Sequence, residues 1–425
     1  MKTKFHYKHL LNFKWLIIGG ICLLTATSCE KDEKQPPEPA PAPAPEPTEG
    51  AVVLPCNYFD TNTLLVNDTL KDVDYIIDCF MLVQNGEVII EEGVTIEFSE
   101  HAGLSISDGA RLIAEGTPEA PITLTGVEKT QGYWRGILIN SDLSNSISHT
   151  TIEYAGSQDL SPTAPIYRGS LAAASGSQLH LSHVKVLNGG RYGLDFTGQN
   201  AEISVDHLTI SGNNNYPVKV GAYNAHIFDS NSTFVGNAAD YLNIGTFAYE
   251  IEEVVEWKKL DVPYLVDGGV HIKNNGFLTI AAGTEVNFRS AAYLQARDNA
   301  SPYNYGINVM GTPAEPVLLR AHNGTNWGGI YYNNSQENSI IKHTIIEHAK
   351  GDFSVENLTN TGAIFMRANP HVTIEDTEFR DLPNCAYYAY TGASTNQPDM
   401  PNLSTSNLLL TNVAGGEFCW GDGTE

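Results

Sequence analysis

Apolar residues alternate with polar ones over short runs through most of the chain after about residue 80. The first runs lie at 88–90, 94–98 and 104–106, and Gly, Asn, Asp or Pro separates one run from the next. Alternation with a period of two is typical of a β-strand, and the punctuation indicates a turn about every six to ten residues. Because helical spacing is nearly absent, the pattern predicts an all-β chain of many short strands.

The same blocks of sequence also occur twice, in the same order. The matched blocks are 93–98 with 283–288, 114–122 with 309–317, 133–137 with 326–330, and 149–156 with 343–351. Four matches in one order at a nearly constant offset predict an internal duplication.

Short strands in a duplicated array predict a solenoid. A turn of two or three strands cannot bury its inner face alone, but stacked turns about 4.8 Å apart bury one continuous apolar column. Asn188, Asn213, Asn231 and Asn237 recur at bends and suit left-handed corners and stacked side chains. We therefore predict a right-handed parallel β-helix that is capped at both ends.

A β-propeller or a pair of β-sandwiches is the alternative architecture. Both favour antiparallel hairpins with two-residue turns, and few pairs such as Asn85-Gly86 occur. The predicted organisation therefore remains a solenoid, with these parts: a signal peptide at 1–28, a lipidated cysteine and tether at 29–50, an N-terminal cap at 51–80, a first copy at 81–246, a bridging segment at 247–270, a second copy at 271–382, and a C-terminal cap at 383–425.

The N-terminus has the pattern of an export signal. Residues 1–14 are basic, and the apolar run at 15–24 is too short to span a bilayer comfortably. Small residues before Cys29 resemble a lipoprotein cleavage site, which would make Cys29 the acylated first residue; an ordinary signal peptide with an incidental cysteine is the alternative. The Pro- and Ala-rich stretch at 35–50 favours polyproline II and predicts an extended tether.

Four cysteines remain for the folded part, in two groups at its opposite ends. They are Cys56 and Cys79, then Cys385 and Cys419. Three pairings are open, and we favour Cys56–Cys79 and Cys385–Cys419, because each bond would staple one end. Buried free thiols are the alternative. The absence of any Cys-x-x-Cys string gives a zinc or redox site no support.

The formal net charge of −25 limits the partners. Such a charge repels phosphate backbones, so nucleic acid is not an expected partner, and it disfavours long polyanionic glycans unless a cation bridges them. No cofactor and no metal-binding residues are predicted; Ca²⁺ is the alternative that the acidic composition suits. Nothing in the sequence predicts an oligomeric state.

The matched blocks also carry a family resemblance. The stretches 115–126, 134–137, 151–156 and 282–288 resemble the right-handed parallel β-helix repeat lipoproteins of Bacteroidota, and the charged residues 30–34 resemble their surface-export signal. The resemblance implies a pectate-lyase-like fold on an outer-membrane lipoprotein that faces the cell exterior. It implies little about function, because the wider fold includes lyases, hydrolases and phage tailspikes.

The sequence offers little support for catalysis. Neither the Asp-Asp pair nor the Gly-His-Gly string of polygalacturonase-like hydrolases occurs. His149/Glu153 and His343/Glu347 recur in both copies, but positions i and i+4 of a strand lie about 13 Å apart, so we interpret them as structural. The basic residues considered for proton abstraction lie in no lyase-like context: Arg135, Arg168, Arg191, Lys219, Arg320, Arg367 and Arg380.

Aromatic residues are the better candidates for binding. Exposed rings on the flank of a β-helix would stack on the faces of sugars, although the two tryptophans also suit burial in the column, which leaves the tyrosines as the stronger candidates. The candidate stacking residues are Tyr133, Trp134, Tyr167, Tyr192, Tyr216, Trp327, Tyr331 and Tyr332. The favoured function is a non-catalytic surface lipoprotein that binds carbohydrate or a host surface. The alternatives are a diverged polysaccharide lyase or glycoside hydrolase, and a structural component of an envelope complex.

Overall fold

The computed structural model describes residues 50–246, 250–290, 292–298, 302–335, 338–351, 354–355, 358–359, 362–367, 370–390 and 402–421. The predicted signal peptide, Cys29 and nearly all of the tether therefore lie outside the described residues. Strands dominate the described part, together with three short 3₁₀ helices: η1 (Tyr58–Asp60), η2 (Asn224–Ile227) and η3 (His322–Gly324). Within these residues no helix is long and apolar enough to cross a bilayer.

The strands form four large parallel sheets. The first sheet contains β1 (Val52–Leu54), β3 (Tyr75–Ile77), β5 (Thr95–Phe98), β7 (Ile122–Gly126), β10 (Thr150–Glu153), β13 (Lys185–Leu187) and β16 (Thr209–Ser211). The second contains β2 (Leu64–Leu65), β4 (Phe80–Ile90), β6 (Gly103–Glu115), β8 (Gly136–Asn140), β9 (Ser144–Ser148), β11 (Gly169–Ala173), β12 (Gln178–Ser182), β14 (Tyr192–Phe196), β15 (Glu202–Asp206), β17 (Val218–Val220), β18 (Leu242–Ile244), β21 (Tyr264–Val266), β24 (Glu285–Phe288), β27 (Val317–Ala321), β30 (Thr344–Glu347), β35 (Glu378–Leu382) and β38 (Leu409–Val413).

The other two large sheets belong to the C-terminal half. The third contains β19 (Glu250–Ile251), β22 (Gly269–Ile272), β25 (Tyr293–Ala296), β28 (Ile330–Asn333), β33 (Gly362–Arg367), β36 (Cys385–Tyr390) and β39 (Phe418–Gly421). The fourth contains β20 (Val254–Trp257), β23 (Phe277–Ile280), β26 (Gly306–Met310), β29 (Ser339–Lys342), β34 (Val372–Glu375) and β37 (Leu403–Ser406). A small antiparallel pair, β31 (Ser354–Val355) with β32 (Leu358–Thr359), stands apart.

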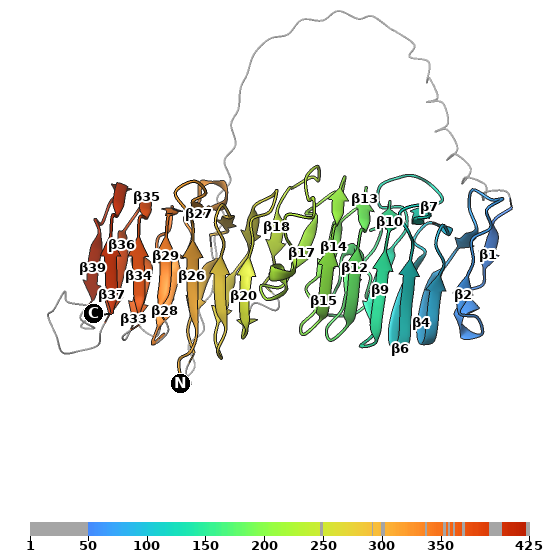
Figure 1. Cartoon of the computed structure of the whole chain (residues 1–425), viewed down its shortest axis with the longest axis horizontal. Helices are drawn as coiled ribbons and strands as arrows, with labels where there is room; N and C mark the ends of the chain where they lie inside the picture. Colours follow the sequence, from blue (N-terminus) through green and yellow to red (C-terminus); the bar gives the residue numbers. More distant parts are fainter. Residues whose placement is uncertain are drawn as a thin grey trace, which may run out of the picture. The chain divides into compact units, whose positions relative to one another are not determined.

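Successive strands of the chain visit the sheets in turn, and each strand pairs with its counterpart one coil later. The long strand β6 shows how a coil is built, because its first half pairs with β8 and its last three residues pair with β9. Figure 1 shows the coils following one another along the long axis, from β1 to β39. Since β31–β32 is the one antiparallel pair of named strands within the described residues, the predicted parallel β-helix is confirmed and a propeller or sandwich is excluded.

The apolar members of each alternating run point into one continuous core. The two tryptophans at equivalent places of the duplication lie in it: Trp134 stacks on Phe98 with ring centroids 4.0 Å apart, and Trp327 stacks on Phe288 at 3.9 Å. Each indole N–H donates to a backbone carbonyl, that of Glu153 in β10 at 2.7 Å and that of Glu347 in β30 at 2.8 Å. Both copies thus build the same corner from the same residues.

Asparagine has two distinct roles at the bends. Asn188 adopts the predicted left-handed conformation, with φ of 54°. Asn213 and Asn237 instead have ordinary φ and form a ladder, in which the Asn213 side-chain amide donates to Asn237 Oδ1 at 2.8 Å. The predicted left-handed conformation was therefore wrong for Asn213, Asn231 and Asn237. The stacking predicted for these bends is confirmed for the pair Asn213 and Asn237.

Equivalent strands of the two copies lie in different sheets, because the second copy is rotated relative to the first by one side of the coil. In the first copy, β5, β7 and β10 lie in the first sheet, but their sequence equivalents β24, β27 and β30 lie in the second. The change occurs where β18 of the first copy pairs with β21 of the bridging segment. At the same point the first sheet ends at β16, and among the described residues β15 pairs with β12 but with no named strand on its far side. We call this break the seam.

The predicted caps and bridging segment also contain strands of the sheets. Residues 51–80 contribute β1, β2 and β3, residues 247–270 contribute β19, β20 and β21, and the C-terminal part ends with β36 to β39. Both favoured disulfides are present, Cys56–Cys79 at one end and Cys385–Cys419 at the other.

Candidate functional site

Five of the eight candidate stacking residues are buried and cannot present a ring face to a sugar. Trp134, Trp327 and Tyr332 are 0% exposed in the main core, so their assignment as stacking residues is wrong. Tyr331 is also 0% exposed and packs against Phe365 in a separate cluster. Tyr167 is 3% exposed. Repeated aromatic residues in a solenoid fill equivalent corners of the core, which is why equivalence between the copies did not indicate a surface role.

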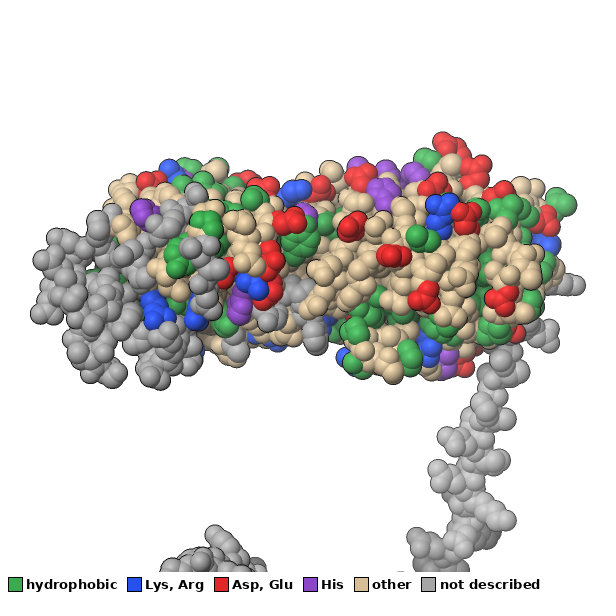
Figure 2. Space-filling view, turned by 90° about the horizontal axis from the view of Figure 1, so that it is seen from below, with side chains coloured by type: hydrophobic (Ala, Val, Ile, Leu, Met, Phe, Trp, Pro, Cys, Tyr) green, Lys and Arg blue, Asp and Glu red, His purple; other side chains and the backbone are tan. Residues whose placement is uncertain are grey.

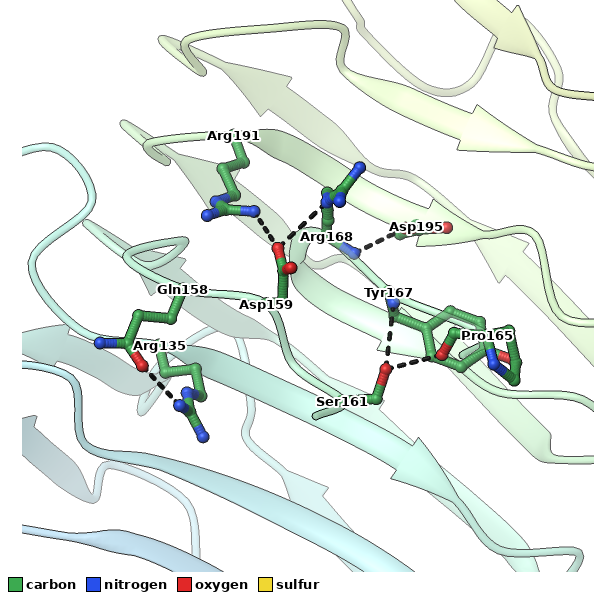
Figure 3. A network of polar contacts seen from close by, with 9 residues as sticks. All are labelled: Arg135, Gln158, Asp159, Ser161, Pro165, Tyr167, Arg168, Arg191 and Asp195. Carbon is green, nitrogen blue, oxygen red and sulfur yellow. Dashed lines mark hydrogen bonds and ion pairs between the residues drawn. The ribbon is translucent and has the colours of Figure 1, made fainter. Parts of the chain in front are cut away.

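Tyr167 instead fixes a loop onto the outside of the coil. Its ring packs with Leu160 against Leu138 of β8 and Ala172 of β11, outside the main core. The Leu160 N–H donates to the Tyr167 carbonyl at 2.9 Å, and the Ser161 hydroxyl donates to the Pro165 carbonyl at 2.7 Å (Figure 3). The loop from 157 to 168 is therefore held over the outer face of β8 and β11.

This loop places an acid between two arginines. Asp159 accepts hydrogen bonds from Arg168 Nε at 3.0 Å and from the Arg191 guanidinium (Figure 3). Burial alone would raise the pKa of Asp159, but the hydrogen bonds and positive charges of Arg168 and Arg191 outweigh it and hold that pKa below its ordinary value. Both arginine side chains stay partly exposed, at 49% and 32%, so each can contact a ligand as well.

Two of the remaining candidates, Tyr192 and Tyr216, lie on consecutive coils beside these arginines. Their rings are nearly parallel, with centroids 6.1 Å apart and an interplanar angle of 6°. The register partner of Tyr192 on the preceding coil is Gly169, which has no side chain to cover the ring from that side. The eighth candidate, Tyr133, is partly buried and packs against the main core.

Cations surround the tyrosine pair. Lys219 Nζ lies 5.3 Å from the centre of the Tyr192 ring. Arg289, from the second copy, donates to Tyr216 Oη at 2.8 Å and to Asp267 at 2.7 Å, so this surface crosses the seam. We call Arg168, Arg191, Tyr192, Tyr216, Lys219 and Arg289 the arginine–tyrosine face. Arg168, Arg191 and Lys219 were each considered from the sequence, but only the coil register brings them together.

Asp195 lies beneath this face. It occupies β14, is 2% exposed, and accepts hydrogen bonds from the Arg168 N–H and the Thr197 hydroxyl, each at 2.7 Å. Its register partner on the next coil is Lys219. Burial raises the pKa of Asp195, and the hydrogen bonds and Lys219 only partly oppose that effect.

The raised pKa of Asp195 makes the free energy of unfolding depend on pH. The folded protein holds the Asp195 proton to higher pH than the unfolded chain, so this group lowers stability as pH rises through the interval above its ordinary value. We expect Asp195→Asn to remove that loss, so the stability of the variant relative to the native protein increases from pH 4 to pH 8. Urea unfolding followed by circular dichroism at several pH values measures the difference. A constant difference across that range contradicts the prediction.

A second surface feature lies at the seam. An open groove of about 940 Å³ is lined by β12, β15, η2 and residues 250–253, and we call it the seam groove. Its lining is polar and acidic, with Gln178, His180, Glu202, Tyr223 and Glu253 among the side chains. Tyr223 is already engaged, because its hydroxyl donates to Glu253 at 3.0 Å. Figure 2 shows that acidic side chains are also scattered along one face of the described unit.

The two surfaces therefore differ in charge. The seam groove carries four carboxylates, from Glu202, Glu250, Glu252 and Glu253, and Lys273 pairs with two of them. Such a groove repels anionic ligands. The arginine–tyrosine face gathers four of the few cations of a chain with only 24 Lys and Arg residues, and it combines them with aromatic rings. We therefore favour the face over the seam groove as the binding site.

Comparison with known proteins adds a solved structure. No family model matches the chain, and no curated protein matches its sequence. Among solved structures, the crystal structure of the Dettilon tailspike protein (gp208) is similar at 9% sequence identity, with a TM-score of 0.21, over 79% of this chain and 62% of that chain. The chain thus spans less than two thirds of the length of that tailspike chain.

Proposed function

We propose that this protein is a lipid-anchored outer-membrane protein that displays a β-helix to the cell exterior and binds carbohydrate without modifying it. The aligned pair Tyr192 and Tyr216, flanked by partly exposed arginine and lysine side chains, is the observation that carries the proposal. Parallel strands hold these side chains in a fixed register, so little conformational entropy is lost when a ligand binds. The lipoprotein-like signal that precedes Cys29 and the Pro- and Ala-rich sequence after it support the anchor.

Sugars match this surface in two ways. The apolar face of a pyranose ring packs on an aromatic ring, and the partly exposed Tyr192, whose register partner is Gly169, offers such a platform. Arg168, Arg191 and Lys219 present N–H donors, and a guanidinium binds a carboxylate through two parallel hydrogen bonds. We therefore propose carbohydrate that carries carboxylate groups, in short segments that avoid the acidic remainder of the molecule.

A glycan array tests the proposal on the purified full chain. We expect binding to oligosaccharides that contain uronic or sialic acid, and weaker binding to their neutral counterparts. Tyr192→Ala and Arg191→Ala should each weaken binding of the best glycan at least about tenfold in calorimetric titration, because each removes a central contact of the site.

The seam groove supplies a matched control. Tyr223→Ala removes a tyrosine of similar exposure from the other surface, and it should leave glycan affinity unchanged. If Tyr223→Ala abolishes binding while Tyr192→Ala does not, the location is wrong. If the array shows no carbohydrate binding at all, the proposed function is wrong.

A diverged polysaccharide lyase is the second candidate, and one observation favours it. Asp195 and Lys219 are register partners beneath and beside the tyrosine pair, which places a buried carboxyl and a lysine on neighbouring coils. Lyases need a base that removes a proton next to a uronate carboxyl. Incubation of the full chain with polygalacturonate, with and without Ca²⁺, would give an unsaturated product that absorbs ultraviolet light if this candidate is correct.

A further inference from the structure

Three histidines stack on consecutive coils at one corner of the first copy. The ring centroids of His149 and His183 are 4.5 Å apart, and those of His183 and His207 are 4.6 Å apart with an interplanar angle of 5°. All three residues have positive φ, between 41° and 55°. We call these residues the histidine ladder. The ladder is separate from the arginine–tyrosine face and was not predicted from the sequence.

The backbone of this corner does not require histidine. A left-handed residue between strands is most easily asparagine, aspartate or glycine, and Asn188, Asn200 and Asn274 occupy other such corners here. In the second copy the same corner contains His343, Asp376 and Asn407 on successive coils, with Asn407 donating to Asp376 at 3.0 Å. Both copies therefore have the same corner with side chains stacked on successive coils, but only in the first copy are these side chains three histidines.

Aspartate joins the ladder at its last step. Asp206 precedes His207 in the chain, and Asp206 Oδ1 lies 2.7 Å from His207 Nδ1. One ligand atom each of His183, Asp206 and His207 lies within 4.8 Å of the others. We infer that His183, Asp206 and His207 bind a divalent transition-metal ion, with Zn²⁺ as the best match, and so link two consecutive coils.

The chemistry of the side chains supports this class of ion. Two imidazole nitrogens and one carboxylate oxygen are a common zinc donor set, whereas Ca²⁺ requires six to eight oxygens. Bonds of about 2.0–2.2 Å in a tetrahedral site put ligand atoms about 3.3 Å apart. Ligand atoms that now lie up to 4.8 Å apart must therefore approach by up to about 1.5 Å, and Asp206 Oδ1 and His207 Nδ1, at 2.7 Å, must separate slightly if both bind. The His207 and Asp206 side chains are 51% and 45% exposed and can rotate, while backbone pairing of β12 with β15 holds their coils together. Water completes the coordination.

Other thiol and imidazole groups do not compete as sites within the described residues. Cys56, Cys79 and Asp78 also lie close together, but both cysteines are joined in a disulfide and have no thiolate to offer. His149 belongs to the ladder but not to the ligand set, because it lies one coil further from Asp206. It therefore makes a matched control.

Zinc titration of the full chain, produced without a histidine tag, tests the inference. Competition with a chromophoric chelator gives the affinity for Zn²⁺. We expect His207→Ala and Asp206→Asn each to weaken the site at least about tenfold, since even outer partners of metal ligands contribute 10- to 100-fold. His149→Ala should change the affinity less than about twofold, and Ca²⁺ should not displace Zn²⁺.

Two further measurements test the proposed zinc site. Circular dichroism should show each variant folded like the native protein, because the side chains of His149, Asp206 and His207 are exposed or partly exposed. Zn²⁺ should raise the unfolding temperature of the native protein and of His149→Ala, and not that of His207→Ala. If the native chain binds no Zn²⁺, or if His149→Ala weakens binding as much as His207→Ala, the proposed site is wrong. Glycan binding by Tyr192 is unaffected by either result.

Discussion

Replacement of Trp327 by alanine should destabilise the protein by about 3–5 kcal/mol, and Trp134→Ala should cost a similar amount. Both side chains are 0% exposed and stack on a phenylalanine of the preceding coil, so truncation leaves a large cavity in the apolar column. The strands of neighbouring coils are fixed by backbone pairing and cannot move inward to fill such a cavity. Urea unfolding followed by far-ultraviolet circular dichroism measures the loss.

Phenylalanine at the same position separates packing from hydrogen bonding. Trp327→Phe keeps a stacked ring against Phe288 but leaves the Glu347 carbonyl without the indole N–H that reaches it at 2.8 Å. We expect a smaller loss of about 1–3 kcal/mol for this variant. If Trp327→Ala unfolds like the native protein but lowers glycan binding, the tryptophan is a surface residue and its burial in the column is wrong.

The sequence predicted the coil because the coil is a local property. Alternating residues such as Val94, Ile96 and Phe98 point inward whatever coil lies next to them, and all three are buried. The disulfides were predictable for a related reason, since cysteines near one another in the chain lie on adjacent coils of a solenoid.

The rotation between the copies was not predictable in this way. Both copies have the same strands and corners, and the side of the coil on which β21 pairs with β18 depends on how the chain from 221 to 263 closes the last coil of the first copy. That segment contains η2, which packs against β15 and β20 in place of a strand.

The candidate site also combines features that could be predicted from the sequence with features that could not. Tyr192 and Tyr216 were singled out for their residue type, and their pairing follows from the 24-residue length of the coil. Arg289 lies 73 residues after Tyr216 and reaches it only because the second copy stacks with its rotation. The histidine ladder had a partial signal, since His149 and His343 were noticed as equivalents, but His183 and His207 have no counterparts of the same type in the second copy.

The disulfides set the stability of the two ends. A coil at the end of a solenoid has a neighbour on one side only, so it opens before the interior coils do. Cys385–Cys419 joins β36 to β39, which are the last two paired strands of the third sheet. For sequence separations of 23 and 34 residues, loss of chain entropy in the open state makes each bond worth about 3–4 kcal/mol.

Removal of both Cys385 and Cys419 as alanines should therefore loosen the C-terminal coil selectively. We expect amide hydrogen exchange in β38 and β39 to accelerate by at least about 150-fold, which corresponds to the lower end of that range, while β14 and β17 keep their protection. Reduction of the native protein should give the same pattern at both ends, and unchanged exchange at residues 409–421 would contradict the prediction. An end that depends on a disulfide keeps its structure only where the bond can form, so selective loosening under reducing conditions would also support an exported location for this chain.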